Sequence, residues 1–293
     1  KLKSLGSYFY NTQARDKITQ CISKYKPDIA HIHLFLGGLT TSILHPLRQA
    51  KIPIVHTVHD YRLLCPGYTF LDRSNNVCEL CRGGFFLRCA YKRCSLEHRF
   101  SHSMMLALDA YYRKYISDPN QLIDHFIFVS NFSRKKHVQF NANYNLKSSM
   151  LYNFRPGGFS RSRVRGKYLL YYGRLSSEKG IELLVEAIKE IKINLKIVGS
   201  GPLEDKLRCI KNSQIEILGY RSGKHLWNLI ENCSFVIVPS LLYENNPLSI
   251  VESFSIGKPV IASDIGGITE LLQDGRGFLV EPNNQGAITI AIN

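Results

Sequence analysis

Two glutamates eight residues apart are the side chains of this sequence best placed to do chemistry. Glu244 lies in a polar loop after the apolar run 235–239, and Glu252 lies inside the helix expected next. Pro247 stands where the first helical turn would begin, which suits its fixed φ and missing N–H. The helix start offers free backbone N–H groups to an anion. A sugar nucleotide fits this arrangement, with the carboxylates on the sugar and ribose hydroxyls. The spacing alone equally allows two surface glutamates.

A second candidate site is a turn with two cations. Arg174 and Lys179 flank a Ser-Ser-Glu turn that follows Gly173 and an apolar strand. Two fixed cations beside a glycine turn suit a diphosphate. The turn 199–201 (Gly-Ser-Gly) is weaker evidence, because a tight entry into a helix explains it equally well.

The elements around these residues alternate between strand and helix. In the C-terminal part we expect strands at 168–172, 195–198, 215–218, 235–239 and 259–262, and helices at 178–191, 202–211, 223–231 and 247–256. Right-handed crossovers would join these strands into one parallel sheet, so the fold class is α/β. In the N-terminal part we expect a basic amphipathic helix within 1–27, strands at 27–33, 53–58, 126–129 and 150–153, and a helix at 96–118.

Three motifs in order resemble a known family. They are YYGRLSSEKG (171–180), IVGSGP (197–202), and the two glutamates with Pro-Leu between them and GKPVIAS (257–263) after them. This pattern resembles the donor site of the retaining glycosyltransferases of family 4. The resemblance implies a GT-B fold, in which two Rossmann-like domains have parallel sheets that face each other across a cleft.

The resemblance also implies a reaction and a set of site residues. A hexose-type sugar would move from a UDP- or GDP-sugar to a hydroxyl with retention, without a metal or other catalytic cofactor. Arg174, Lys179 and the helix start would stabilise the departing diphosphate. His59, in the run PIVHTVHD, would face the reacting sugar and would be catalytic together with Arg174, Lys179 and Glu244. The expected donor-binding residues are Gly173, Arg174, Lys179, Gly201, Glu244, Asn245, Asn246, Pro247, Leu248 and Glu252.

The expected domains follow from the same pattern. Residues 1–154 would form the acceptor-side domain, 155–166 (rich in Pro, Gly, Ser and Arg) a linker, and 167–293 the donor domain. The family's first strand is missing before Lys1, and its last helices are missing after Asn293. We therefore expect a sequence truncated at both ends. His33, at the end of another expected strand, is interpreted as a hydrogen-bonded histidine without a catalytic role.

A cysteine-rich insert occupies residues 61–95, and some family members have a similar one. Cys78 and Cys81 are separated by two residues, and Cys89 and Cys94 follow. These four thiols have the composition of a structural zinc site, although the second pair lacks the close spacing of the first. Disulfides or reduced thiols are the alternatives.

The positive charge is concentrated in the first half of the chain. Residues 1–160 contain 22 Lys and Arg against 9 Asp and Glu, whereas residues 161–293 contain 16 against 14. No nucleic-acid motif accompanies the charge, so we expect no nucleic-acid partner. The resemblance implies a lipid-linked or saccharide acceptor from envelope polysaccharide or lipopolysaccharide synthesis, and a cytoplasmic enzyme on an anionic membrane surface. A non-catalytic GT-B-like binding or scaffold protein and a sugar-nucleotide epimerase are the alternatives.

Overall fold

The structure is a computed structural model that describes residues 5–156 and 166–293. The chain splits into unit 1, Lys1–Tyr152, and unit 2, Asn153–Asn293, which are treated separately below. Most of the expected linker, residues 157–165, lies outside the described residues, as do Lys1 and Lys3. Within the described ranges, no helix is both long and apolar enough to cross a membrane.

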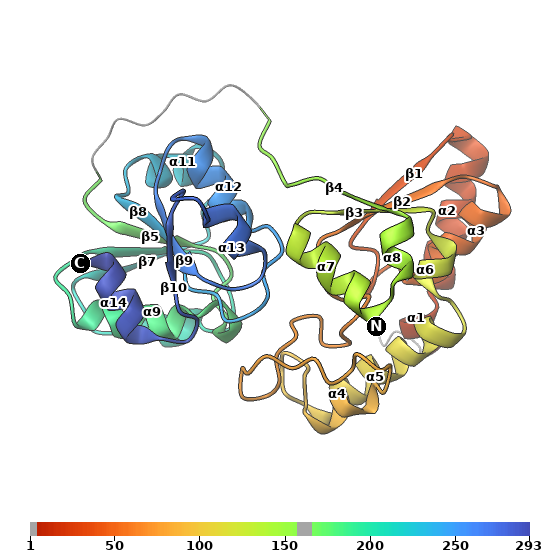
Figure 1. Ribbon diagram of the computed structural model, residues 1–293, viewed down its shortest axis with the longest axis horizontal. Coiled ribbons are helices and arrows are strands. Elements are labelled where there is room, and N and C mark those ends of the chain that lie inside the picture. The colour runs from red at the N-terminus through yellow and green to blue at the C-terminus, as the bar shows by residue number, and fades with distance from the viewer. Residues whose placement is uncertain (1–4, 157–165) are drawn as a thin grey trace. The chain divides into compact units, whose positions relative to one another are not determined.

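Unit 1 is built on a parallel four-stranded sheet (Figure 1). Its strands β1 (Ala30–His33), β2 (Ile54–Val58), β3 (His125–Phe128) and β4 (Ser148–Met150) lie in sequence order. β4 begins earlier than expected because Phe126 pairs with Ser148, which sets the register of the short edge strand. The helices of the unit are α1 (Leu5–Phe9), α2 (Thr12–Tyr25), α3 (Leu44–Gln49), α4 (Leu87–Tyr91), α5 (Phe100–Tyr115), α6 (Pro119–Leu122), α7 (Asn131–Phe140) and α8 (Asn143–Leu146).

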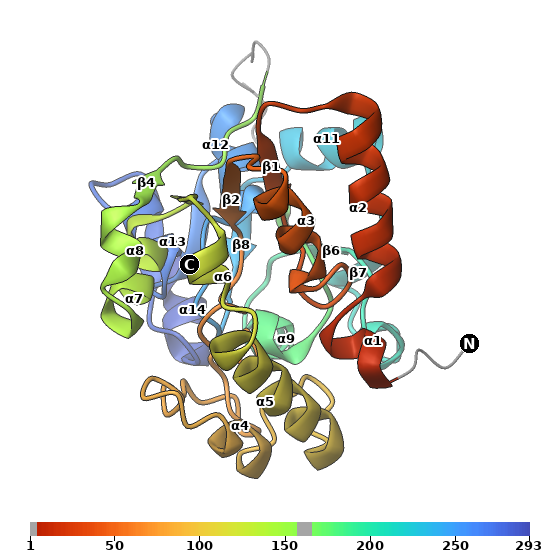
Figure 2. The ribbon, with the colours of Figure 1, turned by 90° about the vertical axis from the view of Figure 1, so that its right-hand side faces the viewer.

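Two pairs of helices in unit 1 are in close contact. The amphipathic α2 lies alongside α3 (Figure 2), whereas α4 and α5 pack together and hold the cysteine-rich insert. The helix expected at 96–118 is shorter, because the extended Arg99 precedes α5 and Asp118 starts a new helix by accepting a hydrogen bond from the Asn120 N–H at 2.8 Å. The insert thus ends on a rigid helix.

Unit 2 is a six-stranded parallel sheet with the strand order β10-β9-β8-β5-β6-β7. Alternate residues of each strand point to opposite faces, so Leu169 and Tyr171 join one buried cluster and Leu170 joins another. The order reverses between the neighbours β5 and β8, and such a switch point is where open α/β sheets bind ligands. The strands are β5 (Leu169–Tyr172), β6 (Leu195–Val198), β7 (Ile215–Gly219), β8 (Phe235–Val238), β9 (Val260–Ser263) and β10 (Phe278–Val280).

The backbone conformation of the preceding residue determines where α9 and α12 begin in unit 2. The helix expected from residue 178 starts at Ile181, because Gly180 adopts the left-handed conformation (φ 68°) after a short 3-10 turn. The sequence placed Pro247 at the start of the first helical turn, but its extended ψ of 125° makes it the N-cap residue that precedes the helix. The helices are α9 (Ile181–Lys189), α10 (Glu204–Arg208), α11 (Gly223–Glu231), α12 (Leu248–Ser255), α13 (Gly267–Leu272) and α14 (Gln285–Ile292).

Candidate functional site

A cavity of about 340 Å³ opens at the switch point of unit 2. It lies past the carboxyl ends of β5 and β8 and beside the start of α12. Seven of the residues expected to bind the donor line it: Gly173, Arg174, Lys179, Glu244, Pro247, Leu248 and Glu252. The fold therefore brings residues that are up to about eighty positions apart in the sequence together around one cavity.

A short polar network crosses this cavity. The Lys179 ammonium lies 2.6 Å from Oε1 of Glu244, and the Ser240 hydroxyl donates to the same oxygen at 2.7 Å. Glu244 is 9% exposed, so its carboxylate is taken out of water and held by these two donors. The Gly267 N–H donates to the Glu244 carbonyl at 2.7 Å, which fixes the loop itself. The network presents a positioned carboxylate and a cation to any ligand that enters.

The second glutamate has a different environment. Glu252 is half-buried in α12, near the hydroxyl of Tyr172, and burial raises the pKa of its carboxyl group. The Tyr172 hydroxyl donates to the Ser249 carbonyl at 2.7 Å and so packs against the first turns of α12. Glu252 is thus a hydrogen-bonding carboxylate at the edge of the apolar face, as its apolar neighbours in the sequence indicated.

A hydrogen bond from a side chain fixes the backbone of the turn that carries Arg174 and Lys179. The Tyr171 hydroxyl donates to the Arg174 carbonyl at 2.7 Å, while the Arg174 side chain is exposed at the cavity. Gly201 does not line the cavity; a side-chain carbon there would lie 2.4 Å from the Leu175 carbonyl oxygen. Gly201 therefore supports the turn by close packing, and a direct contact with a donor stays a prediction.

Asn245 and Asn246 are buried beside the site and do not line the cavity. The Asn246 carbonyl accepts a hydrogen bond from the Asn153 side chain at 2.9 Å. Oδ1 of Asn245 has no hydrogen-bond partner among the described residues. The expected contact of both asparagines with a donor stays a prediction.

Unit 1 places a group of histidines at the carboxyl ends of β1 and β2. Nδ1 of His33 lies 2.7 Å from Nε2 of His59, and the ring centroids of His31 and His33 are 4.4 Å apart. Burial and the neighbouring histidines lower the pKa of both His33 and His59, so both rings are neutral at pH 7. His59 therefore has a fixed orientation, and its partner His33 was interpreted from the sequence only as a hydrogen-bonded histidine.

His56 makes unit 1 sensitive to acid. Its ring is buried between Phe35 and Phe126, and burial lowers its pKa from 6.5 to about 4. As the pH falls, His56 binds a proton in the unfolded chain before it does so in the folded chain. The contribution of neutral His56 to the stability of unit 1 is therefore fully present above pH 6.5 and is lost as the pH falls toward 4. We expect urea unfolding monitored by far-UV circular dichroism to show a loss over this window, of which His56 accounts for about 3 kcal/mol.

The control for this prediction separates His56 from other histidines. His56→Gln should remove about half of the pH dependence, because the buried His137, whose pKa burial lowers to about 3, contributes a comparable part over the same window. His225→Gln, on the exposed surface of α11, should leave the profile unchanged. An unchanged profile in His56→Gln would contradict the assignment.

The cysteine insert does not show the expected zinc site. Cys81, Cys89 and Cys94 form a small buried cluster against Phe86, whereas Cys78 is only partly buried. Burial and the neighbouring thiols raise the pKa of Cys81 to about 12, which favours a protonated thiol. Across residues 5–156 and 166–293, no three His, Cys, Asp or Glu side chains are arranged to hold a metal ion. The zinc prediction is therefore not supported, and the thiols act here as small apolar groups.

Sequence reasoning missed two contributors to the donor-side cavity. Ser240 holds Glu244, and Tyr172 lies beside Glu252. Tyr172 ends the apolar strand β5, and Ser240 follows shortly after the apolar strand β8. Their place at the ends of apolar strands was the signal that the sequence offered. Such positions become recognisable only when the strand order is known.

Comparison with known proteins agrees with this fold. Residues 159–293 match the family described as glycosyl transferases group 1. A structure of HepE from Anabaena in complex with UDP and glucose is similar over 95% of this chain and 70% of that chain, with a TM-score of 0.64 and 20% identity. Residues 159–293 are thus similar to the glycosyl transferases group 1, and the two parallel α/β units have the GT-B type of fold.

Curated relatives carry related names. An uncharacterized glycosyltransferase of Methanocaldococcus jannaschii is 39% identical over 120 residues, which is 39% of this chain and 34% of the relative. A lipopolysaccharide 1,2-N-acetylglucosaminetransferase of Salmonella typhimurium is 34% identical over 144 residues, 43% of this chain and 38% of the relative. An uncharacterized protein in the cps region of Klebsiella pneumoniae is 22% identical over 89% of this chain and 64% of its own length. The chain thus matches about one third to two thirds of these relatives.

Proposed function

We propose that the protein is a retaining glycosyltransferase that transfers a hexose-type sugar from a nucleotide-diphosphate sugar to a hydroxyl acceptor. The observation that carries this proposal is the cavity at the β5/β8 switch point, where Arg174, Lys179, Glu244 and Glu252 converge. Retention and independence from metal rest on the family resemblance. The names of the relatives support the general activity.

The side chains suit distinct parts of such a donor. Arg174, Lys179 and the N–H groups at the start of α12 would bind the diphosphate and stabilise the charge that develops as it departs. Glu244 would accept hydrogen bonds from sugar hydroxyls, and Glu252 from the ribose. The neutral ring of His59 in unit 1 remains the group expected to face the reacting sugar.

The raised pKa of Glu252 leads to a test of its role. The ionised carboxylate accepts hydrogen bonds from ribose hydroxyls better than the protonated acid does, so donor affinity should fall as the pH drops through this raised pKa. Isothermal titration calorimetry with UDP between pH 8 and pH 5 measures the effect. Glu252→Gln should bind UDP weakly at every pH. A Glu252→Gln variant with the wild-type pH profile would show that another group titrates.

The acceptor we propose is a lipid-linked or saccharide intermediate of envelope polysaccharide or lipopolysaccharide synthesis. One relative is named for lipopolysaccharide, and another for its place in a cps region. The deciding experiment offers UDP-, GDP- and ADP-sugars to the purified protein with membrane extracts and identifies products by mass spectrometry. A transferred sugar supports the proposal, an epimerised donor indicates an epimerase, and donor binding without turnover indicates a binding protein.

We also propose a cytoplasmic protein that binds an anionic membrane surface through unit 1. Arg88 and Arg93 of the insert are exposed, beside the exposed rings of Phe85 and Tyr91. Each cation near an anionic surface contributes about 1 kcal/mol, which salt screens. We expect co-sedimentation with anionic vesicles that disappears at a few hundred millimolar salt, roughly where the Debye length falls below 5 Å. Equal binding to neutral vesicles would contradict an electrostatic origin.

A further inference from the structure

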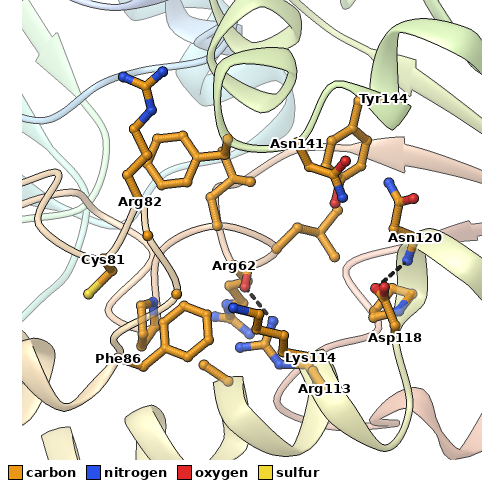
Figure 3. Close-up of a pocket in the computed structure, with 18 residues that line it drawn as sticks. Arg62, Cys81, Arg82, Phe86, Arg113, Lys114, Asp118, Asn120, Asn141 and Tyr144 are labelled. Atoms are coloured by element: carbon orange, nitrogen blue, oxygen red, sulfur yellow. Dashed lines mark hydrogen bonds between the residues drawn. The ribbon is translucent and has the colours of Figure 1, made fainter.

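A second cavity, of about 380 Å³, lies within unit 1 beneath the cysteine-rich insert. Figure 3 shows that its wall combines the segment after β2, the insert, the end of α5 and the region from α6 to α8. Arg62, Arg82, Arg113 and Lys114 line it, together with a single carboxylate, Asp118. The donor cavity lies in unit 2 and shares no residue with it.

The positive charge of this cavity is only partly compensated. Arg62 lies 3.2 Å from the carboxylate of Asp60, and Arg113 lies 2.8 Å from that of Asp109. Within the described part of the chain, Lys114 forms no ion pair and no hydrogen bond. Its ammonium faces the aromatic rings of Phe86 and Tyr115, at 6.0 and 5.3 Å from the ring centroids.

The cations are held in place before any ligand arrives. Arg113 is 7% exposed and donates to the Arg62 carbonyl at 2.6 Å, and the Arg62 guanidinium donates to the Leu36 carbonyl at 2.6 Å. Gly84 of the insert passes directly over Lys114, since a side-chain carbon there would lie 2.0 Å from Nζ. Fixed like charges around one space repel each other until an anion enters. Preorganised cations of this kind suit the oxygens of phosphate groups.

We propose that this cavity binds the phosphate or diphosphate group of an organic phosphate ester. Phe86 and the other apolar walls, Leu63, Leu64 and Phe140, would cover the organic part. Arg62 and Leu63 also line the small cavity that contains His59, so a bound ester would extend toward that histidine. The identification of this ester with the acceptor rests on the proposed function, whereas the binding of phosphate in this cavity does not.

Lysine footprinting tests the site independently of activity. Acylation of the purified protein, read by mass spectrometry, should show several-fold protection of Lys114 by inorganic pyrophosphate. Lys135, exposed on α7 and outside the cavity, is the internal control and should react as before. UDP should protect Lys179, which lines the donor cavity. Failure at Lys179 alone counts against the proposed function, whereas failure at Lys114 with both pyrophosphate and lipid vesicles counts against this site.

A binding measurement with variants completes the test. Pyrophosphate affinity should fall about tenfold in Lys114→Ala, the loss expected for one charge-assisted contact, and should be unchanged in Lys135→Ala. Protection of Lys114 by phosphatidylglycerol vesicles but not by soluble pyrophosphate would identify a lipid headgroup as the phosphate source. The reverse would identify a soluble ester. No protection by either, or equal affinity in both variants, would overturn the proposal.

Discussion

Replacing Lys179 or Arg174 by alanine should lower kcat for sugar transfer by about two to four orders of magnitude. That is the typical cost of losing one group that stabilises charge in the transition state. Both cations line the cavity at the switch point, but of the two only Lys179 has a carboxylate partner among the described residues, Glu244 at 2.6 Å. Steady-state kinetics with a saturating donor measures the effect.

Two comparisons make this prediction specific. Lys179→Ala also leaves the Glu244 carboxylate without its cation, so it should lower thermal stability as well, whereas Arg174→Ala should affect catalysis alone. Lys206→Ala is the matched control, because Lys206 forms an exposed pair with Glu182 at 2.5 Å outside the cavity. Wild-type rates in both Arg174→Ala and Lys179→Ala would remove the diphosphate assignment.

Gly180→Ala should destabilise unit 2 by about 3 to 5 kcal/mol, because a left-handed conformation and overpacking are both costly. Gly180 has a φ of 68°, and a side-chain carbon there would lie 1.9 Å from the Pro239 carbonyl oxygen. The backbone after β8 would have to move, and with it Ser240 and Glu244. We expect a lower midpoint in urea unfolding and weaker UDP binding from the same variant.

The chain provides a control for the backbone strain. Gly223 also has a positive φ, 56°, but no atom lies within 4 Å of the added carbon. Gly223→Ala should therefore cost only about 1 to 2 kcal/mol, the strain of the left-handed conformation. Equal losses in the two variants would show that the contact with Pro239 has no effect of its own.

Much of unit 2 could be predicted because its strands are apolar, short and bounded by turns. The expected strand 195–198 and the expected helix 223–231 coincide with β6 and α11, and seven expected residues line one cavity. The start of α9 was misplaced, because periodicity does not reveal that Gly180 adopts a left-handed conformation. Local sequence patterns are sufficient to predict regular strands and helices, but they do not predict the residue at which a helix begins.

Unit 1 was harder to predict for a physical reason. The cysteine spacing indicated a metal site, but spacing does not determine whether four thiols point to one centre or join a packed cluster. The pairing of His33 with His59 depends on the alignment of β1 with β2, in which His33 lies opposite Thr57. The cavity beneath the insert depends on contacts between α5 and residues far away in the sequence, and no local motif encodes it.

The strand order of unit 2 also affects the order in which its parts fold during synthesis. β5 pairs with β6 and, on its other side, with β8, where Leu169 lies opposite Phe235. During synthesis β5, β6 and β7 emerge first, and one edge of β5 stays without its neighbour until β8 has left the ribosome. Such long-range parallel pairing is slow. The ligand pocket, which needs both strands, is therefore among the last parts of unit 2 to form, and a nascent chain that ends before residue 235 would expose an apolar edge prone to aggregation.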